Sequence, residues 1–183
     1  TPNRADCLGV HGIARDLAAA GYGALKPLDT SAHEGSFDSP VTWRLDLDGA
    51  EHLAPLITGI AFRGVTNGPS PDWMARRLNA IGQRPISALV DITNYVMFDL
   101  GRPLHAYDID KIHGSELIVR QADGGEPFAA LNEKTYEMEA GMITIGDAEG
   151  VDDLAGVMGG ERTGVNDGTT GMFLEIAVFD PIS

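Results

Sequence analysis

The fold is decided by residues 84–108, RPISALVDITNYVMFDLGRPLHAYD. Apolar side chains recur in this stretch at the spacing of a helix, so one side of that helix can face a core. The members of this apolar stripe are Ile86, Leu89, Val90, Thr93, Val96, Met97 and Leu100. Asp91 and Asn94 are expected to lie off the stripe, on the more polar side of the helix.

The helix is predicted to end at Gly101. Glycine is the usual residue just past a helix end because it enters the left-handed conformation without a Cβ clash, and Pro103 prevents the helix from resuming. The chain then continues in an extended form that carries His105. The stretch therefore predicts a rigid helix, with Arg84 before its start and a histidine on the strand that leaves it.

A chain of 183 residues forms one domain or two small interlocked ones, and it is long enough to bury a core. We expect a helix-and-strand portion, 1–110, interlocked with a strand-rich portion, 111–183. With 43% hydrophobic and 22% charged residues, disorder throughout is not expected. No apolar run approaches the roughly 20 residues of a membrane span, and the first residues lack a signal-peptide pattern. We therefore expect a soluble, intracellular protein with no membrane partner.

The charges and the single cysteine exclude several classes of site. With 13 Lys and Arg residues against 27 Asp and Glu residues, the net charge is −14, which opposes a stand-alone RNA-binding domain that relies on phosphate contacts. Cys7, the one cysteine, excludes an internal disulfide and a thiolate metal cluster, and we interpret it as a plain buried thiol. No two of the five histidines stand at zinc-helix spacing, so no metal site is predicted.

Two more helices are predicted. The first covers residues 6–20, with Asp6 as its N-cap and Gly21 just past its end. The second starts at GPSP, 68–71, with Ser70 as its cap. The side chains expected to face inward are Val10, Ile13, Ala14 and Leu17 in the first helix and Met74, Leu78 and Ile81 in the second.

The remaining apolar segments are short and bounded by turn residues, which is typical of strands. These predicted strands cover 41–47, 56–65, 117–120, 127–131, 135–139, 142–146, 153–159 and 173–179. Segment 21–40 is rich in Gly, Ser, Asp and Pro and is expected to be a surface connector. Because helices and strands are segregated rather than alternating, the predicted class is α+β, with mostly antiparallel strands and a few helices packed on one side.

Glu175 is the most informative single residue. Both faces of the last predicted strand are apolar, so this strand is expected to be central in a sheet. A carboxylate there is costly unless a group donates a hydrogen bond to it. One interpretation is a buried structural partner of Arg84 or of a backbone turn, and the other is a carboxylate that accepts the hydroxyl of a ligand.

Four other residues, Gly159, Gly160, His105 and Arg84, have both a structural and a functional interpretation. Gly159 and Gly160 follow a predicted strand but are not a phosphate cradle, because neither Lys-Ser/Thr nor a helix pattern follows them. They form either an ordinary turn or, with Glu175 downstream, part of a site. His105 is either a satisfied hydrogen-bonding residue or an acid–base group, and Arg84 is either an ion-pair partner or a contact for an anion or carbonyl.

Three blocks of the sequence resemble, in the same order, the editing region of the bacterial phenylalanyl-tRNA synthetase beta subunit. They are TPNRADCLGVHGIARDLAAAG at 1–21, the central stretch at 84–108 and LAGVMGGERTGVNDGTTGMFLEIAVFDP at 154–181, and the resemblance is weakest over 22–62. It implies the editing-domain fold of that family and hydrolysis of tyrosine wrongly attached to tRNA(Phe). A pocket shaped for phenylalanine rejects an added hydroxyl only about 100-fold, whereas a site that binds the hydroxyl discriminates by on the order of 10⁴.

Carried over by position, the family pattern assigns Glu175 as acceptor for the tyrosine hydroxyl and Gly159 as a backbone contact to the same group. His105 and Arg84 would lie near the amino acid and the terminal adenosine. The implied reaction is hydrolysis of the aminoacyl ester by a positioned water, in which His105 is a general base or a positioning group and the ribose hydroxyl of the substrate can assist. Ile176 replaces a small polar residue of the family, but its side chain is expected on the other face of the strand.

The resemblance also implies partners. The family continues beyond the position of Ser183, so this chain is expected to be an editing-domain portion of a larger beta subunit. The full synthetase would be a cytoplasmic α2β2 phenylalanine-tRNA ligase that uses ATP and Mg²⁺ and binds the 3′ end of tRNA(Phe), with no cofactor in this portion. The alternative is a non-catalytic structural or interaction module of the synthetase.

Overall fold

The computed structural model describes residues 3–181 and divides the chain into two compact units. The helical unit comprises Thr1–Asp38 and Pro69–Leu104, and the strand unit comprises Ser39–Gly68 and His105–Ser183. Each unit is therefore built from two separate pieces of the chain. The division expected near residue 110 differs from the observed boundary, because strand residues 39–68 precede the second and third helices in the sequence.

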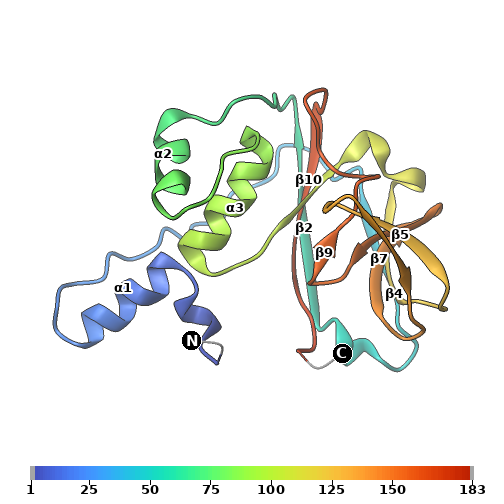
Figure 1. The fold of residues 1–183 in the computed structure, drawn as a ribbon, viewed down its shortest axis with the longest axis horizontal. Helices are drawn as coiled ribbons and strands as arrows, with labels where there is room; N and C mark the ends of the chain where they lie inside the picture. Colours follow the sequence, from blue (N-terminus) through green and yellow to red (C-terminus); the bar gives the residue numbers. More distant parts are fainter. Residues whose placement is uncertain (1–2, 182–183) are drawn as a thin grey trace. The chain divides into compact units, whose positions relative to one another are not determined.

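Three α-helices form the helical unit (Figure 1). They are α1 (Val10–Ala19), α2 (Asp72–Ala80) and α3 (Ala88–Leu100), and a short 3₁₀ helix, η1 (Ala5–Cys7), precedes them. The predicted stop after α3 is confirmed: Gly101 has φ 71° and ψ 24°, and its amide donates to the Met97 carbonyl at 2.8 Å. A left-handed residue at this position satisfies a terminal carbonyl that would otherwise lack a partner.

Both predicted N-caps are wrong. Helix α1 begins at Val10 after Gly9, whereas Asp6 lies in η1 and forms an ion pair with Arg4 at 2.8 Å. Helix α2 has no side-chain cap, because the Ser70 hydroxyl donates to the carboxylate of Asp91 instead. For Ser70 a tertiary partner competes successfully with the local cap, whereas Asp6 lies too far before α1 to cap it.

Asp91 was expected on the polar side of α3, but it is fully buried. Its carboxylate accepts the Ile86 amide at 2.9 Å and the hydroxyl of Ser70. It therefore ties the first turn of α3 to the segments before both helices, as a buried carboxylate with donors on both oxygens can. The side chain of Ile86 itself is 65% exposed and precedes the helix, so it does not extend the apolar stripe.

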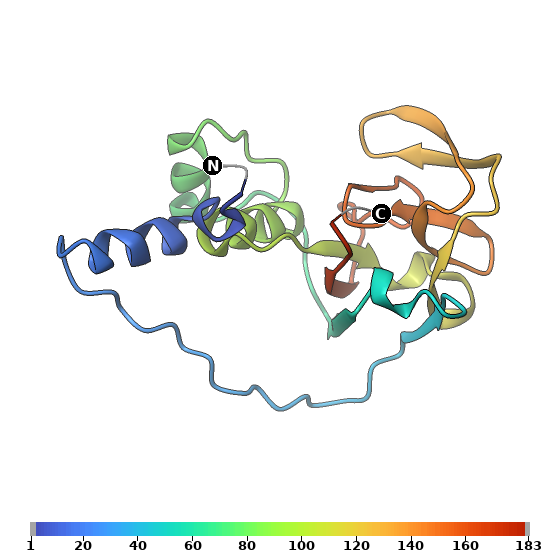
Figure 2. The ribbon, with the colours of Figure 1, turned by 90° about the horizontal axis from the view of Figure 1, so that it is seen from below.

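The predicted inward face of α1 is also wrong, because Val10, Ile13 and Leu17 are each at least half exposed. In α2, Met74 and Leu78 are buried as expected, but Ile81 is exposed. What brings α1 close to the rest of its unit is glycine: a Cβ on Gly9 would lie 2.3 Å from the backbone nitrogen of Gly101, and one on Gly12 would lie 1.5 Å from the carbonyl of Asp6. Between α1 and the first strand, the chain is a connection without helix or strand, as predicted (Figure 2).

Three sheets form the strand unit. The first has the order β1-β4-β7-β8-β9, the second β2-β10-β3, and the third is the β5-β6 hairpin. Their bounds are β1 (Thr42–Asp46), β2 (Leu56–Arg63), β3 (His105–Asp108), β4 (Glu116–Gln121), β5 (Glu126–Ala130), β6 (Lys134–Met138), β7 (Ile143–Asp147), β8 (Gly150–Leu154), β9 (Met158–Gly159) and β10 (Gly171–Val178). Three short 3₁₀ helices lie between them: η2 (Glu51–Leu53), η3 (Ile109–Lys111) and η4 (His113–Ser115).

The predicted α+β class with mostly antiparallel pairing is confirmed, and among the pairs of described strands only β1 with β4 is parallel. The strand predicted at 153–159 is in fact the end of β8, a turn and the short β9. Gly156 in that turn has φ +72°, which a strand residue does not adopt. The turn lets β9 fold back against β8, so that Asp153 and Gly159 face each other across the pair.

Candidate active site

The candidate site is organised by β10, the central strand of the β2-β10-β3 sheet (Figure 1). The sequence-based expectation that this strand is central is therefore confirmed. Glu175 lies directly opposite His105 of β3 and opposite Gly59 of β2. Directly paired residues in antiparallel strands point to the same face of a sheet, so the carboxylate and the imidazole share one face. Glu175 is only 7% exposed, so that face is largely withdrawn from water.

The ring of His105 is enclosed by protein on several sides. It packs edge-on against the ring of Tyr107, with centroids 4.4 Å apart and planes at 74°. Its Nε2 atom lies 3.6 Å from Oδ1 of Asp153, and its side chain is 20% exposed. Nε2 is buried and, together with Nε1 of Trp43, belongs to the few buried side-chain polar atoms of the described residues that lack a hydrogen-bond partner.

Gly159 lies against the same ring. A Cβ built on Gly159 would stand 2.4 Å from Cε1 and 2.8 Å from Nδ1 of His105, far inside van der Waals contact. Only glycine lets the β9 backbone pass this close to the imidazole. The carbonyl of Gly159 also accepts the amide of Leu131 at 3.0 Å, which connects β9 to the end of the β5-β6 hairpin.

Two residues of the site were missed by the sequence analysis. Tyr107 is fully buried and donates its hydroxyl to Oδ2 of Asp153, which is itself 5% exposed. Burial raises the pKa of Asp153, and the nearby charge of His105 opposes that rise. Burial also raises the pKa of Tyr107 well above its usual value, with further contributions from the charges of Asp153 and Glu175. The available signal was the strand alternation, which places Tyr107 on the same face as His105.

The strand unit therefore brings three of the four predicted site residues together, since Glu175 is paired with His105 and Gly159 contacts the His105 ring. Arg84 belongs to the helical unit, where it is exposed and lies between α2 and α3. Its assignment to the site stays a prediction from the resemblance.

A second polar cluster lies on the opposite side of β8. Arg162 donates to Asp147 at 2.7 and 3.0 Å and to Asp152 at 2.7 Å, and the Thr163 hydroxyl donates to Asp152 at 3.1 Å. Burial raises the pKa of Asp152 to about 7, although the charge of Arg162 favours the ionised form. Asp147 also accepts the amides of His113 and Glu149, so its ligands all come from the protein. This cluster has the composition of a structural ion network.

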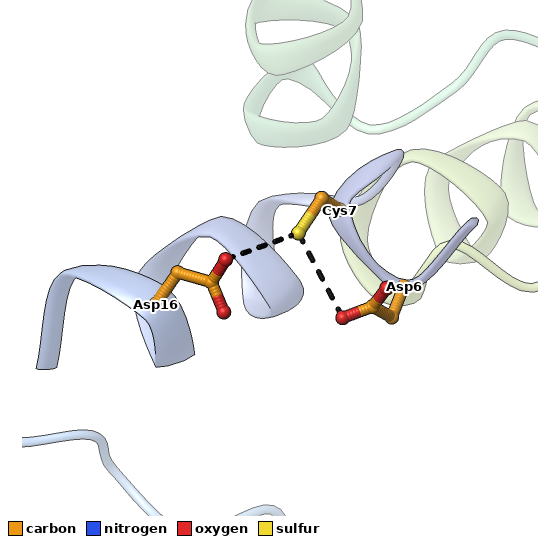
Figure 3. Close-up of side chains that lie close together, drawn as sticks. All are labelled: Asp6, Cys7 and Asp16. Carbon is orange, nitrogen blue, oxygen red and sulfur yellow. Dashed lines mark hydrogen bonds between the residues drawn. The ribbon is translucent and has the colours of Figure 1, made fainter. Parts of the chain in front are cut away.

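A third group lies in the helical unit, where Asp6, Cys7 and Asp16 approach one another (Figure 3). The Cys7 sulfur donates to the carboxylates of Asp16 and Asp6 at 3.4 and 3.7 Å. Cys7 is only partly buried, which modifies the expectation of a buried thiol, and desolvation raises its pKa. Both carboxylates are already paired with Arg4, and Asp6 also with Arg15, so the group is neutralised by protein charges.

Within residues 3–181, the structure contains no helix with the length and apolar composition of a membrane span.

The sequence profile of the B3/4 domain family matches residues 53–183. The chain is similar to the phenylalanine-tRNA ligase beta subunit of Paramagnetospirillum magneticum, with 54% identity over 183 residues that cover 100% of this chain and 23% of the relative. It is similar to the beta subunit of Novosphingobium aromaticivorans, with 53% identity over 181 residues that cover 99% of this chain and 22% of the relative. The chain thus spans less than a quarter of the length of these curated relatives.

Among solved structures, the fold is similar to that of an N-terminal fragment of the phenylalanyl-tRNA synthetase beta subunit from Pyrococcus horikoshii. The TM-score is 0.57 at 16% sequence identity, and the match covers 98% of this chain and 54% of that fragment. At this identity the likeness supports the fold.

Proposed function

The chain belongs to the B3/4 domain family and is related over its whole length to phenylalanine-tRNA ligase beta subunits, and we propose that it carries the site at which such an enzyme hydrolyses tyrosine wrongly attached to tRNA(Phe). The observation that supports this most directly is the pairing of Glu175 with His105 on adjacent strands, with both side chains on one buried face. A hydrogen-bond acceptor and an acid–base group are thereby held side by side by the backbone of one sheet.

In this proposal Glu175 accepts the phenolic hydroxyl of tyrosine. A carboxylate accepts several hydrogen bonds, so Glu175, which is 7% exposed, can accept the substrate hydroxyl in addition to its contacts within the protein. Phenylalanine offers no such donor, so its binding would leave the carboxylate without that partner. A site of this kind discriminates by a factor on the order of 10⁴ in favour of the hydroxylated substrate.

His105 acts as the general base. A water adds to the carbonyl carbon of the tyrosyl ester, and its proton passes to the imidazole. The bond between the carbonyl carbon and the ribose oxygen then breaks, and the proton is delivered to that oxygen. The products are free tyrosine and tRNA with its terminal hydroxyl restored. A positioned histidine contributes about 10²- to 10⁴-fold to reactions of this kind.

Gly159 contributes chiefly because it has no side chain. The resemblance assigns its backbone to the recognition of the tyrosine hydroxyl, whereas the contacts support a role in making room for the imidazole of His105. The two roles are compatible, because a carbonyl oxygen has two lone pairs and the Leu131 amide uses one of those on Gly159.

We place this activity within a complete phenylalanine-tRNA ligase, together with the remainder of a beta subunit, an alpha subunit and the 3′ end of tRNA(Phe), in the cytoplasm. The charge of −14 means that most of the affinity for tRNA would come from other parts of that enzyme. The Gly159–Gly160 pair does not fit ATP and Mg²⁺, because it lacks the Lys-Ser/Thr and helix that a nucleotide cradle needs. We therefore assign nucleotide binding to the rest of the enzyme.

The test is deacylation of Tyr-tRNA(Phe) by a complete ligase whose beta subunit carries this chain at the matching positions. Glu175→Ala is expected to slow deacylation by at least about 100-fold, because it removes the acceptor for the substrate hydroxyl. His105→Ala is expected to slow it by a similar factor, within the usual contribution of an acid–base group. Glu161→Ala, which removes an exposed carboxylate from the same motif, is the matched control and is expected to have no effect. Clearance of Tyr-tRNA(Phe) at the wild-type rate in both site variants would remove the assignment.

A second candidate function is a non-catalytic interaction module, which the exposed apolar residues Val10, Ile13 and Leu17 of α1 favour. Crystals soaked with tyrosine or with phenylalanine separate the two functions. The editing site predicts that tyrosine binds with its hydroxyl at Glu175 and that phenylalanine does not. An interaction module predicts no preference between the two amino acids.

A further inference from the structure

We propose that Asp153, held in place by Tyr107, is a positioning residue that fixes the orientation of the His105 imidazole, an inference that rests on the proposed function of His105. Neither Asp153 nor Tyr107 was assigned a role by the resemblance. Both lie in the strand unit, Asp153 on β8 and Tyr107 on β3, and so the arrangement depends only on contacts within one unit.

The buried nitrogen of His105 lies near the Asp153 carboxylate. Nε2 is buried without a hydrogen-bond partner, and Oδ1 of Asp153 lies 3.6 Å away. This separation is longer than a hydrogen bond. Catalytic hydrogen bonds are often long in a free site and shorten when substrate binds. The nearby carboxylate therefore supplies the acceptor that a buried N–H needs.

Tyr107 holds the Asp153 carboxylate in place. Its other oxygen, Oδ2, accepts the hydroxyl of the fully buried Tyr107. The Tyr107 ring also packs edge-on against the imidazole, so one side chain contacts both members of the pair. Because Tyr107 is anchored in the core, the carboxylate has little freedom to turn away from His105.

Gly159 lies at the edge of the ring formed by Cε1 and Nδ1. Gly159 pairs with Asp153 across β8 and β9, and its missing side chain leaves the space in which the imidazole sits. The same two-strand element therefore supplies the carboxylate and the space. A ring held by Tyr107, Asp153 and Gly159 keeps a single orientation, as a general base requires.

The chemical consequence follows from the two nitrogens of imidazole. When Nε2 carries the proton and donates it toward Asp153, Nδ1 is left with the lone pair that accepts a proton from water. After that transfer the imidazole is positively charged, and the Asp153 carboxylate stabilises the charge. The proton then moves from Nδ1 to the ribose oxygen as the ester bond breaks, so Asp153 neither gains nor loses a proton. The titratable groups expected on the face of the ring are Tyr107 on β3, Asp153 on β8 and Glu175 on β10. Asp108 of β3 and Asp152 of β8 alternate to the other faces of their strands and bond to Thr169 and Thr163.

The experiment measures deacylation of Tyr-tRNA(Phe) as a function of pH in the complete ligase carrying this chain. Asp153→Asn is expected to lower the rate about 10- to 100-fold, at the lower end of what acid–base groups contribute, and to move the acid limb of the pH–rate profile to lower pH. Tyr107→Phe, which keeps the ring and removes only the hydroxyl, is expected to change both in the same direction by less. A purely structural loss would lower the rate equally at every pH and leave the shape of the profile unchanged, which would overturn the proposal.

The matched control is Asp152→Asn. Asp152 precedes Asp153 on β8 and is equally buried, but its carboxylate bonds to Arg162 and Thr163 on the other side of the strand. This variant is expected to keep both the rate and the profile. An Asp152→Asn variant that moved the profile as far as Asp153→Asn would overturn the specific role of Asp153.

A second measurement separates this proposal from the proposed function. Crystal structures of the ligase with Asp153→Asn are expected to show the His105 ring turned from its wild-type orientation, whether or not the enzyme deacylates tRNA. If His105→Ala abolishes deacylation while Asp153→Asn leaves the rate, the profile and the ring unchanged, the positioning role is wrong and the proposed function stands. If His105→Ala has no effect, the proposed function fails, and a turned ring in Asp153→Asn still supports the structural part of the inference.

Discussion

Helix α1 and the candidate site depart from ordinary residue placement in opposite ways. On α1 the apolar residues Val10, Ile13 and Leu17 are at least half exposed, whereas in the strand unit Asp153 and Glu175 are 5% and 7% exposed. Exposed apolar residues are common on folded proteins, but buried carboxylates are not. The buried carboxylates are the more informative of the two, because each needs hydrogen-bond partners, and those of Asp153 include a residue of the candidate site.

The largest effect is expected for the core on which that site rests. Phe173 of β10 is 1% exposed and packs against Trp43 with ring centroids 5.6 Å apart. Phe173→Ala is expected to lower the free energy of unfolding by about 3–5 kcal/mol, because the cavity adds to the lost transfer free energy. Urea unfolding measures this change. Val178→Ala, a truncation at the 37% exposed end of the same strand, is the control and is expected to cost far less.

The next largest loss of stability is expected for a buried tyrosine of the strand unit, compared with an exposed tyrosine of the helical unit. Tyr107→Phe leaves the buried Asp153 carboxylate without its hydroxyl donor and is expected to cost about 1–3 kcal/mol of stability. Tyr95 of α3 accepts a hydrogen bond from Arg77 at an exposed position, so Tyr95→Phe is expected to cost at most about 1 kcal/mol. Thermal or urea unfolding of both variants provides the comparison. Equal losses would show that the buried hydroxyl has no special energetic role.

Some features of the fold and of the candidate site could be predicted from the sequence, and others could not. The end of α3 at Gly101 and the central position of β10 were predicted, because both depend on local residue types and on alternation. The pair formed by Tyr107 and Asp153 was not, because its members stand 46 residues apart and meet only through strand pairing. Asp91 was missed for the same reason, since Ser70 reaches it from 21 residues away.

The third prediction concerns the pH dependence of stability, which is expected to have opposite signs for Asp152 in the strand unit and Asp6 in the helical unit. Burial raises the pKa of Asp152 from 3.8 to about 7, so the folded protein binds more protons than the unfolded chain between these values. Its contribution to stability is therefore fully present below about pH 4 and is lost as pH rises toward 7. Asp152→Asn is expected to remove this slope in urea unfolding measured from pH 4 to 7.

Asp6 of the helical unit provides the contrast. The hydrogen bond from Arg4 holds the pKa of Asp6 well below its usual value, so its contribution is present above the unfolded pKa and is lost as pH falls through the folded one. Because the pair is exposed, solvent screens it and the effect is small. Asp6→Asn is expected to flatten stability only on the acid side. A flattening between pH 4 and 7 in this variant would contradict the assignment of that slope to Asp152.

The smallest effect is expected on the apolar face of α1. Leu17 is 51% exposed and lines a groove with residues of the following connection, including Tyr22 and Leu25. Leu17→Ser is expected to change the free energy of unfolding of this chain by no more than about 0.5 kcal/mol, because surface substitutions rarely do more. The helical periodicity of α1 predicted a buried stripe, but periodicity reports only that one side is apolar and does not identify what covers it. A loss of more than about 1 kcal/mol in the free energy of unfolding would show that this side of α1 is covered. The exposed apolar side of α1 would then no longer contrast with the buried polar residues of the candidate site.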